Sequence, residues 1–202
     1  MKRVIIATKN EGKATEFKEL FRAYQIQAVS LNDLKELPDV EETGSTFEEN
    51  ATLKAETIAS LLSLPVIADD SGLVIDALDG RPGVYSARYA GEEKNDQANI
   101  NKVLSELKNI PENKRTAKFV CVLAFAKPGM ETMLYKGYCH GRIANSPIGT
   151  NGFGYDPIFI PDARQLTMAQ LTQEQKNAIS HRHHALKQLE ASLKEQDIIF
   201  ER

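Results

Sequence analysis

Two strand-like stretches of similar length flank a four-residue turn in the second half of the chain, and they restrict the fold more than any other feature. Residues 116–126 and 131–143 carry the apolar, β-branched and aromatic side chains that are typical of strands. The segment between them, KPGM, contains the Pro-Gly pair that marks a tight turn. We therefore predict one long antiparallel hairpin.

Strand and helix patterns alternate in the first part of the chain, which together with the hairpin predicts a mixed α/β fold. Ser45 with Glu48 is a capping-box signature for a helix over residues 46–63, and Thr172 with Gln175 predicts a second capping box. The other expected strands span residues 3–8, 26–31, 66–69, 73–77 and 158–160, and the other helices span 10–21 and 95–108 and begin near 172 and 180. Ser71-Gly72 is expected to form a turn between two of these strands. We find no linker, so residues 1–202 are expected to form one domain.

Composition excludes some classes of partner. The 202-residue chain has a net charge of -3 and a pI of about 5.9, which disfavours binding to a nucleic acid polymer. No stretch has the 18 or so apolar residues of a membrane helix. Cys121 and Cys139 have no CxxC spacing, so we expect two buried thiols in a cytoplasmic protein without a signal peptide or membrane contact.

The segment TKNEGK, residues 8–13, lies where a buried strand meets a helix. The N-terminus of a helix favours phosphate, and Thr8, Asn10 and Lys13 add hydrogen-bond donors. It is not a Walker A loop, which has a second glycine before the lysine. From these residues alone, a phosphate loop and a simple helix cap both remain open.

Two acidic segments suggest a metal site. In IADDSG, Asp69 and Asp70 follow an apolar run, and neighbouring strand residues point to opposite faces. One carboxylate can therefore reach a ligand at the end of the strand while the other holds the turn. Mg²⁺ suits such a carboxylate because it takes one or two protein carboxylates, waters and phosphates. An Asx-turn is the alternative for this pair, and a solvated turn is the alternative for Glu41 and Glu42 in the loop DVEETG.

Two later segments could recognise a base. GTNGFGYDP, residues 149–157, offers glycines for close approach of the backbone and Phe153 or Tyr155 for stacking, although aromatic residues beside glycine also fill cores. SHRHH, residues 180–184, lacks the cysteine pair typical of zinc sites, so we favour a polar helix start over a metal site.

Five blocks in order resemble the inosine/xanthosine triphosphate pyrophosphatases, from about residue 4 to residue 189. The blocks are ATKNEGKATEF, EETGSTFEENATLKA, IADDSGLVIDALDGRPGVYSARYAG, GTNGFGYDPIF and AISHRHHAL. The resemblance implies an elongated, two-lobed α/β fold with a central active-site cleft, usually in a homodimer. It also implies Mg²⁺-dependent hydrolysis of inosine, deoxyinosine and xanthosine triphosphates to monophosphate and pyrophosphate, which cleanses the nucleotide pool. His183 is a departure, because many relatives have glycine there.

The same resemblance assigns roles to individual positions. Asp70 matches the metal-binding catalytic acid, and either Glu41 or Glu42 completes the metal site, while Asp69 is expected to brace the turn. The positions that match substrate contacts are Thr8, Lys9, Asn10, Glu11, Gly12, Lys13, Lys54, Ser71, Phe153, Gly154, Tyr155, Asp156, Lys176, His181 and Arg182.

Hydrogen-bond polarity suggests how such a pocket selects its base. Lys176 and Arg182 carry only donors, which suit the C6 carbonyl of hypoxanthine or xanthine and oppose the amino group of adenine. Two other interpretations are a related pyrophosphatase for modified pyrimidine triphosphates and a nucleotide-binding sensor without turnover. The first differs at the base pocket, and the second predicts binding without hydrolysis.

Overall fold

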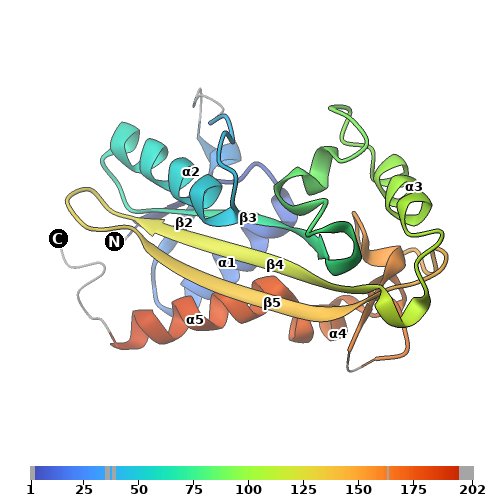
Figure 1. Ribbon diagram of the computed structural model, residues 1–202. Helices are drawn as coiled ribbons and strands as arrows, with labels where there is room; N and C mark the ends of the chain where they lie inside the picture. The colour runs from blue at the N-terminus through green and yellow to red at the C-terminus, as the bar shows by residue number, and fades with distance from the viewer. Residues whose placement is uncertain (1–2, 35–36, 38–39, 163, 196–202) are drawn as a thin grey trace. The chain divides into compact units, whose positions relative to one another are not determined.

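The structure is a computed structural model that describes residues 3–34, 37, 40–162 and 164–195. Six strands of the described chain form one sheet in the order β2-β1-β3-β4-β5-β6 (Figure 1). The strands are β1 (Arg3–Ile6), β2 (Gln27–Ser30), β3 (Val66–Ile75), β4 (Thr116–Ala126), β5 (Met133–Ile143) and β6 (Phe159–Pro161). The α-helices are α1 (Glu11–Ala23), α2 (Phe47–Leu62), α3 (Asp96–Glu106), α4 (Gln173–Ile179) and α5 (His181–Glu195). The predicted mixed α/β class is confirmed.

Parallel pairing organises the N-terminal part of the sheet. β1 pairs with β2 from Arg3↔Gln27 to Ile6↔Ser30, and it pairs with β3 on its other side. All three β1 residues after Arg3 are buried, because a central parallel strand is covered on both faces. The polar loop after β1 therefore starts at the end of a fixed strand.

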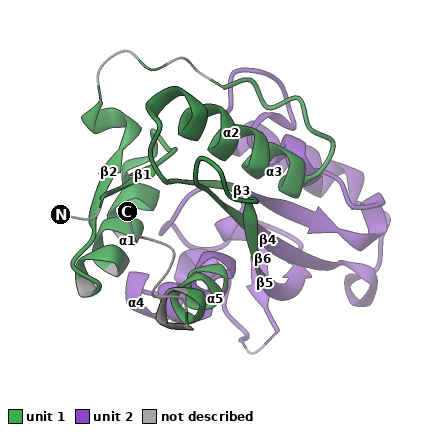
Figure 2. Cartoon of the chain, turned by 90° about the vertical axis from the view of Figure 1, so that its left-hand side faces the viewer, with its two compact units in different colours: residues 1–70, 122–136, 185–202 green, residues 71–121, 137–184 purple. Residues whose placement is uncertain are grey.

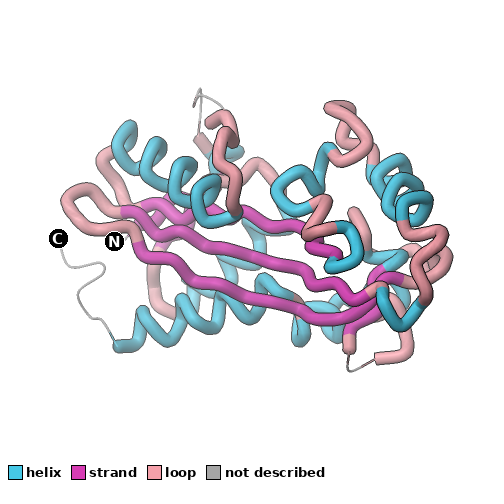
Figure 3. The backbone as a smooth tube through the Cα atoms, viewed as in Figure 1, coloured by secondary structure: helices cyan, strands magenta, loops and turns pink. Residues whose placement is uncertain are grey.

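The predicted hairpin is confirmed. β4 and β5 are neighbours in the sheet and are joined by residues 127–132 (Figure 3). In this turn the N–H of Met130 donates to the carbonyl of Lys127 at 3.1 Å. Gly129 has φ +82°, a conformation that glycine adopts without a steric penalty. The second strand begins at Met133, two residues later than the sequence predicts.

The predicted turn at Ser71-Gly72 is wrong. β3 continues without a break from Val66 to Ile75, and the chain turns only at Asp76–Leu78. β3 lies between β1 and β4, and a strand with neighbours on both sides gains ladder hydrogen bonds that outweigh the weak turn tendency of Ser-Gly. The expectation that Asp69 braces this turn is therefore also wrong.

Helix N-termini follow the sequence signals closely. Asn95 caps α3 and Thr172 forms the predicted capping box with Gln175. The cap of α2 is one residue later than predicted, at Thr46, whose side chain accepts the N–H of Glu49. The neighbouring serine instead donates its N–H and hydroxyl to the Glu49 carboxylate, at 2.7 and 2.8 Å. Serine and threonine are both common N-cap residues, so the residue type alone does not show which of the two caps the helix.

The chain divides into two compact units, which Figure 2 shows in different colours. Unit 1 contains residues 1–70, 122–136 and 185–202, and unit 2 contains residues 71–121 and 137–184. Unit 2 has its own hydrophobic cluster, in which Phe119, Tyr155 and Phe159 are buried. Among the described residues, none of the helices combines the length and apolar character needed to cross a bilayer. The expected two-lobed shape and central cleft stay predictions.

Candidate active site

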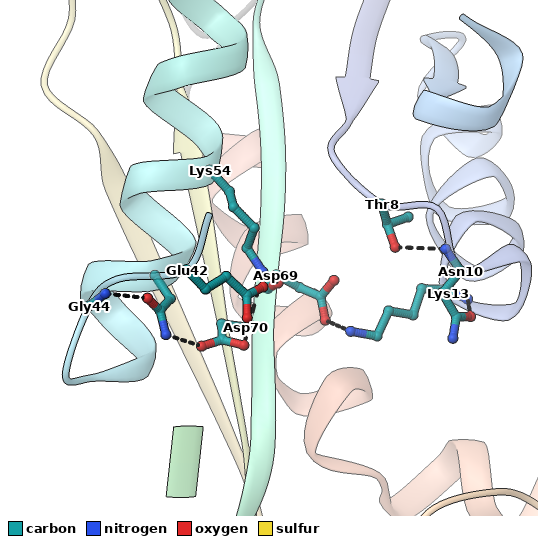
Figure 4. Close-up of polar contacts among 9 residues, drawn as sticks. Thr8, Asn10, Lys13, Glu42, Gly44, Lys54, Asp69 and Asp70 are labelled. Carbon is teal, nitrogen blue, oxygen red and sulfur yellow. Dashed lines mark hydrogen bonds and ion pairs between the residues drawn. The ribbon is translucent and has the colours of Figure 1, made fainter. Parts of the chain in front are cut away.

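The loop between β1 and α1 uses its own polar atoms to begin the helix. Oδ1 of Asn10 accepts the N–H of Lys13 at 3.0 Å, and the N–H of Asn10 donates to Oγ1 of Thr8 at 3.1 Å (Figure 4). Lys9, Glu11 and Gly12 are exposed beside this cap. Asn10 therefore caps α1 as predicted, but Lys13 is half-buried beside Asp69 and is not the solvated lysine of a simple cap. The cap leaves the Lys13 side chain extending from the first helical turn, and its binding to phosphate stays a prediction.

Asp69 and Asp70 point to opposite faces of β3, as strand geometry predicts (Figure 4). Oδ2 of Asp69 accepts a hydrogen bond from Nζ of Lys13 at 2.5 Å, and the side chains are 2% and 20% exposed, respectively. Asp70 faces the α2 side, where Nδ2 of Asn50 donates to its Oδ2 at 3.1 Å. The two neighbouring carboxylates thus have different partners, and Asp69 holds a lysine rather than a turn.

Lys54 of α2 links both aspartates to the acidic loop. Its Nζ donates to Oε1 of Glu42 at 2.6 Å and to the main-chain oxygen of Asp69 at 2.7 Å, and it lies 4.0 Å from Oδ1 of Asp70. Burial disfavours the ammonium form, but the three surrounding carboxylates outweigh burial and raise the pKa of Lys54. Lys54 is therefore a fixed positive charge in this cluster.

Asp70 is a carboxylate whose pKa is raised by its surroundings. Burial raises its pKa from 3.8 to about 6, and repulsion from Glu42 and Asp69 acts in the same direction. Lys54 and the hydrogen bond from Asn50 oppose the rise without cancelling it. A carboxylate with a pKa near neutrality can accept a proton or, when ionised, attract a cation.

The arrangement distinguishes the two glutamates of the acidic loop. Glu42 is half-buried and contacts Lys54 near Asp70, whereas Glu41 is exposed. Two carboxylates that repel each other in a buried setting fit a divalent cation, because Mg²⁺ combines one or two carboxylates with water and phosphate oxygens. In the part of the chain that the structure describes, no group of three or more His, Cys, Asp or Glu residues forms a fuller metal site.

A second polar cluster lies in unit 2, around Asp156. Its Oδ2 accepts hydrogen bonds from Nζ of Lys176 at 2.5 Å and from the N–H of Phe153 at 3.0 Å. The Lys176 ammonium also lies 4.8 Å from the centroid of the Phe153 ring, and Phe153 is 58% exposed. The structure thus presents an exposed aromatic face beside a held ammonium group.

The other predicted residues of unit 2 that contact its interior are buried or half-buried. Tyr155 is buried in the hydrophobic cluster and donates its hydroxyl to the carbonyl of Ser86 at 2.7 Å, so it fills the core and does not offer a face for stacking. Arg182 is buried, and the His181 ring stacks on Phe119 with centroids 5.0 Å apart. Ser71 is half-buried in β3, directly after Asp70.

Two residues that the sequence reasoning did not single out hold predicted site residues in place. Asn50 donates to Asp70, and Asp96 accepts the N–H of Gly154 at 2.7 Å. A buried asparagine inside a helix could have been noticed, because asparagine is a poor helix former. Asp96 gives no such signal, because an acidic residue in the first turn of a helix already has a sufficient reason to be there.

Gly152→Ala should disrupt the polar cluster formed by Phe153, Asp156 and Lys176, called the unit 2 cluster. Gly152 has φ +79°, and a Cβ atom there would overlap the Asp156 carboxylate and lie 3.1 Å from Nζ of Lys176. Gly129→Ala is the matched control, because Gly129 has φ +82° and open space around it. We expect urea denaturation to show that Gly152→Ala lowers the free energy of unfolding by about 1–3 kcal/mol more than Gly129→Ala. Equal losses would mean that the Asp156–Lys176 pair tolerates the added methyl group.

Comparison with known proteins identifies the family. A profile of the Ham1 family matches residues 4–192. The dITP/XTP pyrophosphatase of Oceanobacillus iheyensis is 62% identical over 191 residues, covering 94% of this chain and 97% of the relative. The dITP/XTP pyrophosphatase of Halalkalibacterium halodurans is 58% identical over 190 residues, covering 94% and 98%. The structure of the Staphylococcus aureus Ham1 protein has a TM-score of 0.90 and 51% identity, covering 96% of this chain and 99% of that one.

The fold is thus that of a Ham1 protein, a mixed α/β fold already present in solved structures. The family profile covers far more than half of the sequence, and this chain belongs to the Ham1 family. The resemblance that the five sequence blocks indicate is confirmed at the level of the family.

Proposed function

We propose that this protein hydrolyses non-canonical purine nucleoside triphosphates, such as inosine, deoxyinosine and xanthosine triphosphates. Water attacks the α-phosphorus, the bond to the α–β bridging oxygen breaks, and pyrophosphate leaves with the electron pair. The products are the nucleoside monophosphate, pyrophosphate and a proton. Relatives that are 62% and 58% identical carry the name dITP/XTP pyrophosphatase, which supports this reaction.

The group formed by Lys13, Glu42, Lys54, Asp69 and Asp70, called the unit 1 cluster, is the observation that carries the proposal. Asp70 is buried beside Glu42 and Lys54, where its carboxylate can orient a water molecule and accept its proton. Lys13 and Lys54 are the two lysines of the cluster, and both would interact with phosphate oxygens. A triphosphate with about four negative charges needs such local positive charge in a chain of net charge -3.

The same proposal includes Mg²⁺ held by Asp70 and Glu42. When bound, the ion would neutralise phosphate oxygens and so stabilise the charge of the transition state. Glu42 is preferred over Glu41 because only Glu42 lies in the cluster with Lys54. Asn50 and Lys54 would keep the two carboxylates in place before the ion arrives.

We propose that the unit 2 cluster recognises the base. Phe153 would stack on the purine ring, and Lys176, with His181 and Arg182, would present donors to its C6 carbonyl. A mispaired buried polar group costs about 1–3 kcal/mol, so adenine would be disfavoured roughly tenfold or more. Asp156 would orient the Lys176 ammonium for this task. We further propose that residues 1–202 act as one catalytic domain, in a cytoplasmic homodimer.

Product analysis tests the proposal directly. The protein is incubated with inosine, xanthosine, deoxyinosine, guanosine, adenosine or thymidine triphosphate, with and without Mg²⁺, and the products are separated. We expect monophosphate and pyrophosphate from the first three nucleotides, only when Mg²⁺ is present. Guanine also has a C6 carbonyl, so rejection of guanosine triphosphate would depend on its 2-amino group and on the shape of the pocket. Release of orthophosphate, or equal turnover of all six, would contradict the proposed reaction or its base selection. Binding without turnover would favour a sensor.

A further inference from the structure

Asn50 is a buried polar residue whose place in the helix needs an explanation. It is the fourth residue of α2, is 1% exposed, and continues the helix by donating its N–H to the carbonyl of Thr46 at 3.1 Å. Asparagine is a poor helix former, and a buried amide is costly unless its oxygen and nitrogen both find partners. The reason for an asparagine here must therefore lie in its side-chain contacts.

The two side-chain contacts of Asn50 define its orientation. The main-chain N–H of Gly44 can only donate, so the atom facing it, 2.8 Å away, must be Oδ1. The amide nitrogen Nδ2 then necessarily faces Asp70, and it donates to Oδ2 at 3.1 Å. One side chain thus joins the loop that carries Glu42 to the carboxylate of Asp70.

Gly44 is shaped to permit this connection. A Cβ atom at this position would lie 2.7 Å from Oδ1 of Asn50 and 2.7 Å from Cβ of Glu49. Only glycine lets the loop approach the helix so closely. Because Gly44 follows Glu42 by two residues, the same hydrogen bond that secures Gly44 also restrains the position of Glu42.

We propose that Asn50 is a positioning residue, which fixes the rotation of the Asp70 carboxylate and the distance between Asp70 and Glu42. This inference rests on the proposed function, in which these two carboxylates serve the reaction. With Oδ2 held on the α2 side, Oδ1 is the oxygen that lies 4.0 Å from Nζ of Lys54. Without Asn50 the carboxylate loses the hydrogen bond at Oδ2, and the loop loses its contact at Gly44.

The chain contains a matched control at Asn99. Asn99 is also the fourth residue of its helix, α3, and is also buried. Its Oδ1 accepts the N–H of Ala90 at 2.7 Å, but its Nδ2 donates to the carbonyl of Ala87 at 3.1 Å. The two asparagines therefore share their helical position, burial and loop contact, and differ in that only Asn50 binds a carboxylate.

The test compares Asn50→Leu, Asn50→Asp and Asn99→Leu, with Asp70→Asn as a reference for the reaction itself. Turnover of inosine triphosphate with Mg²⁺ gives kcat and KM, and hydrogen exchange measured by NMR reports on the Gly44 amide. We expect Asn50→Leu to lower kcat about ten- to a hundredfold while KM changes less than about threefold, and to speed exchange at Gly44. Asn99→Leu should lower the melting temperature similarly but keep kcat within about twofold.

Asn50→Asp separates the two hydrogen bonds. The new carboxylate can still accept the N–H of Gly44, so exchange there should stay slow, but it cannot donate to Asp70 when ionised. Burial beside Asp70 favours the protonated form of the new carboxyl group, which can still donate, so we expect kcat to fall relative to the wild type as the pH is raised and this group ionises. Wild-type kcat in Asn50→Leu, wild-type kcat in Asn50→Asp at every pH, or an equal loss in Asn99→Leu would overturn the inference. If Asn50→Leu does not fold, Asn50→Asp decides the outcome. Turnover retained by Asp70→Asn would instead remove Asp70 from the proposed mechanism, and absence of turnover in the wild type would refute the proposed function.

Discussion

Asp70→Asn is expected to lower kcat for inosine triphosphate by about 10²–10⁴-fold, because the amide can neither accept the proton of the attacking water nor bind a cation as an anion. The overall shape of the side chain is kept, and the amide can still accept the hydrogen bond from Asn50. Steady-state kinetics with saturating Mg²⁺ measure the effect. Wild-type turnover would remove Asp70 from the mechanism.

The same variant is expected to be more stable than the wild type when divalent cations are removed. The pKa of Asp70 is raised in the folded protein, from 3.8 to about 6, so its contribution to stability is fully present below pH 3.8 and is lost as the pH rises through 6. At pH 8 the ionised carboxylate therefore destabilises the fold, by up to about 3 kcal/mol at 1.36 kcal/mol for each pKa unit. Asparagine removes this charge.

Urea denaturation at pH 8 in EDTA should show a gain of about 1–3 kcal/mol for Asp70→Asn, and the gain should shrink as the pH falls from 6 to 4. Adding Mg²⁺ should stabilise the wild type, because ligands that bind only the folded state do so, and should leave the variant unchanged. Equal stability of the two proteins at pH 8 would mean that the Asp70 carboxylate is not desolvated.

Local sequence signals predicted most of the secondary structure because they act within a few residues. Asn10, Asn95 and Thr172 cap helices by hydrogen bonds to the N–H group three residues ahead, and Pro128-Gly129 turns a hairpin. Such interactions depend little on the rest of the chain. The turn at Ser71-Gly72 failed for the opposite reason, because the neighbours of β3 in the sheet come from distant parts of the sequence.

The partners of the site residues lie farther apart in sequence and could not be read from motifs. Residue types identified Asp69 and Lys13 as candidates, and the family resemblance identified Lys54, but the Lys13–Asp69 pair joins residues 56 positions apart. The choice of Glu42 over Glu41 likewise depends on which side chain the loop turns toward Lys54. The role of Tyr155 could not be predicted from residue type, because an aromatic residue next to glycine can stack on a ligand or fill a core.

The second large effect is expected at the Lys13–Asp69 ion pair, where replacing Lys13 should lower the free energy of unfolding more than replacing Asp69. Lys13→Met removes the ammonium that contacts the Asp69 carboxylate, which is only 2% exposed and then has Lys54 as the more distant positive charge; breaking a buried pair in this way costs up to about 3–5 kcal/mol. Asp69→Asn leaves the Lys13 ammonium, which is 20% exposed and can be hydrated, so the loss should be about 1–2 kcal/mol. The asymmetry follows from unequal burial of the two charges.

The double variant Lys13→Met/Asp69→Asn distinguishes a charge effect from lost packing. With both charges removed, it should be more stable than Lys13→Met alone, and urea denaturation of the four proteins completes the cycle. Lys18→Met is the control, since Lys18 lies on the same helix and pairs with the exposed Asp33 at 2.7 Å, so its loss should be much smaller. Strict additivity of the two single losses would show that the pair contributes nothing to stability. Asp69 would then not fix the position of the Lys13 side chain before the triphosphate binds.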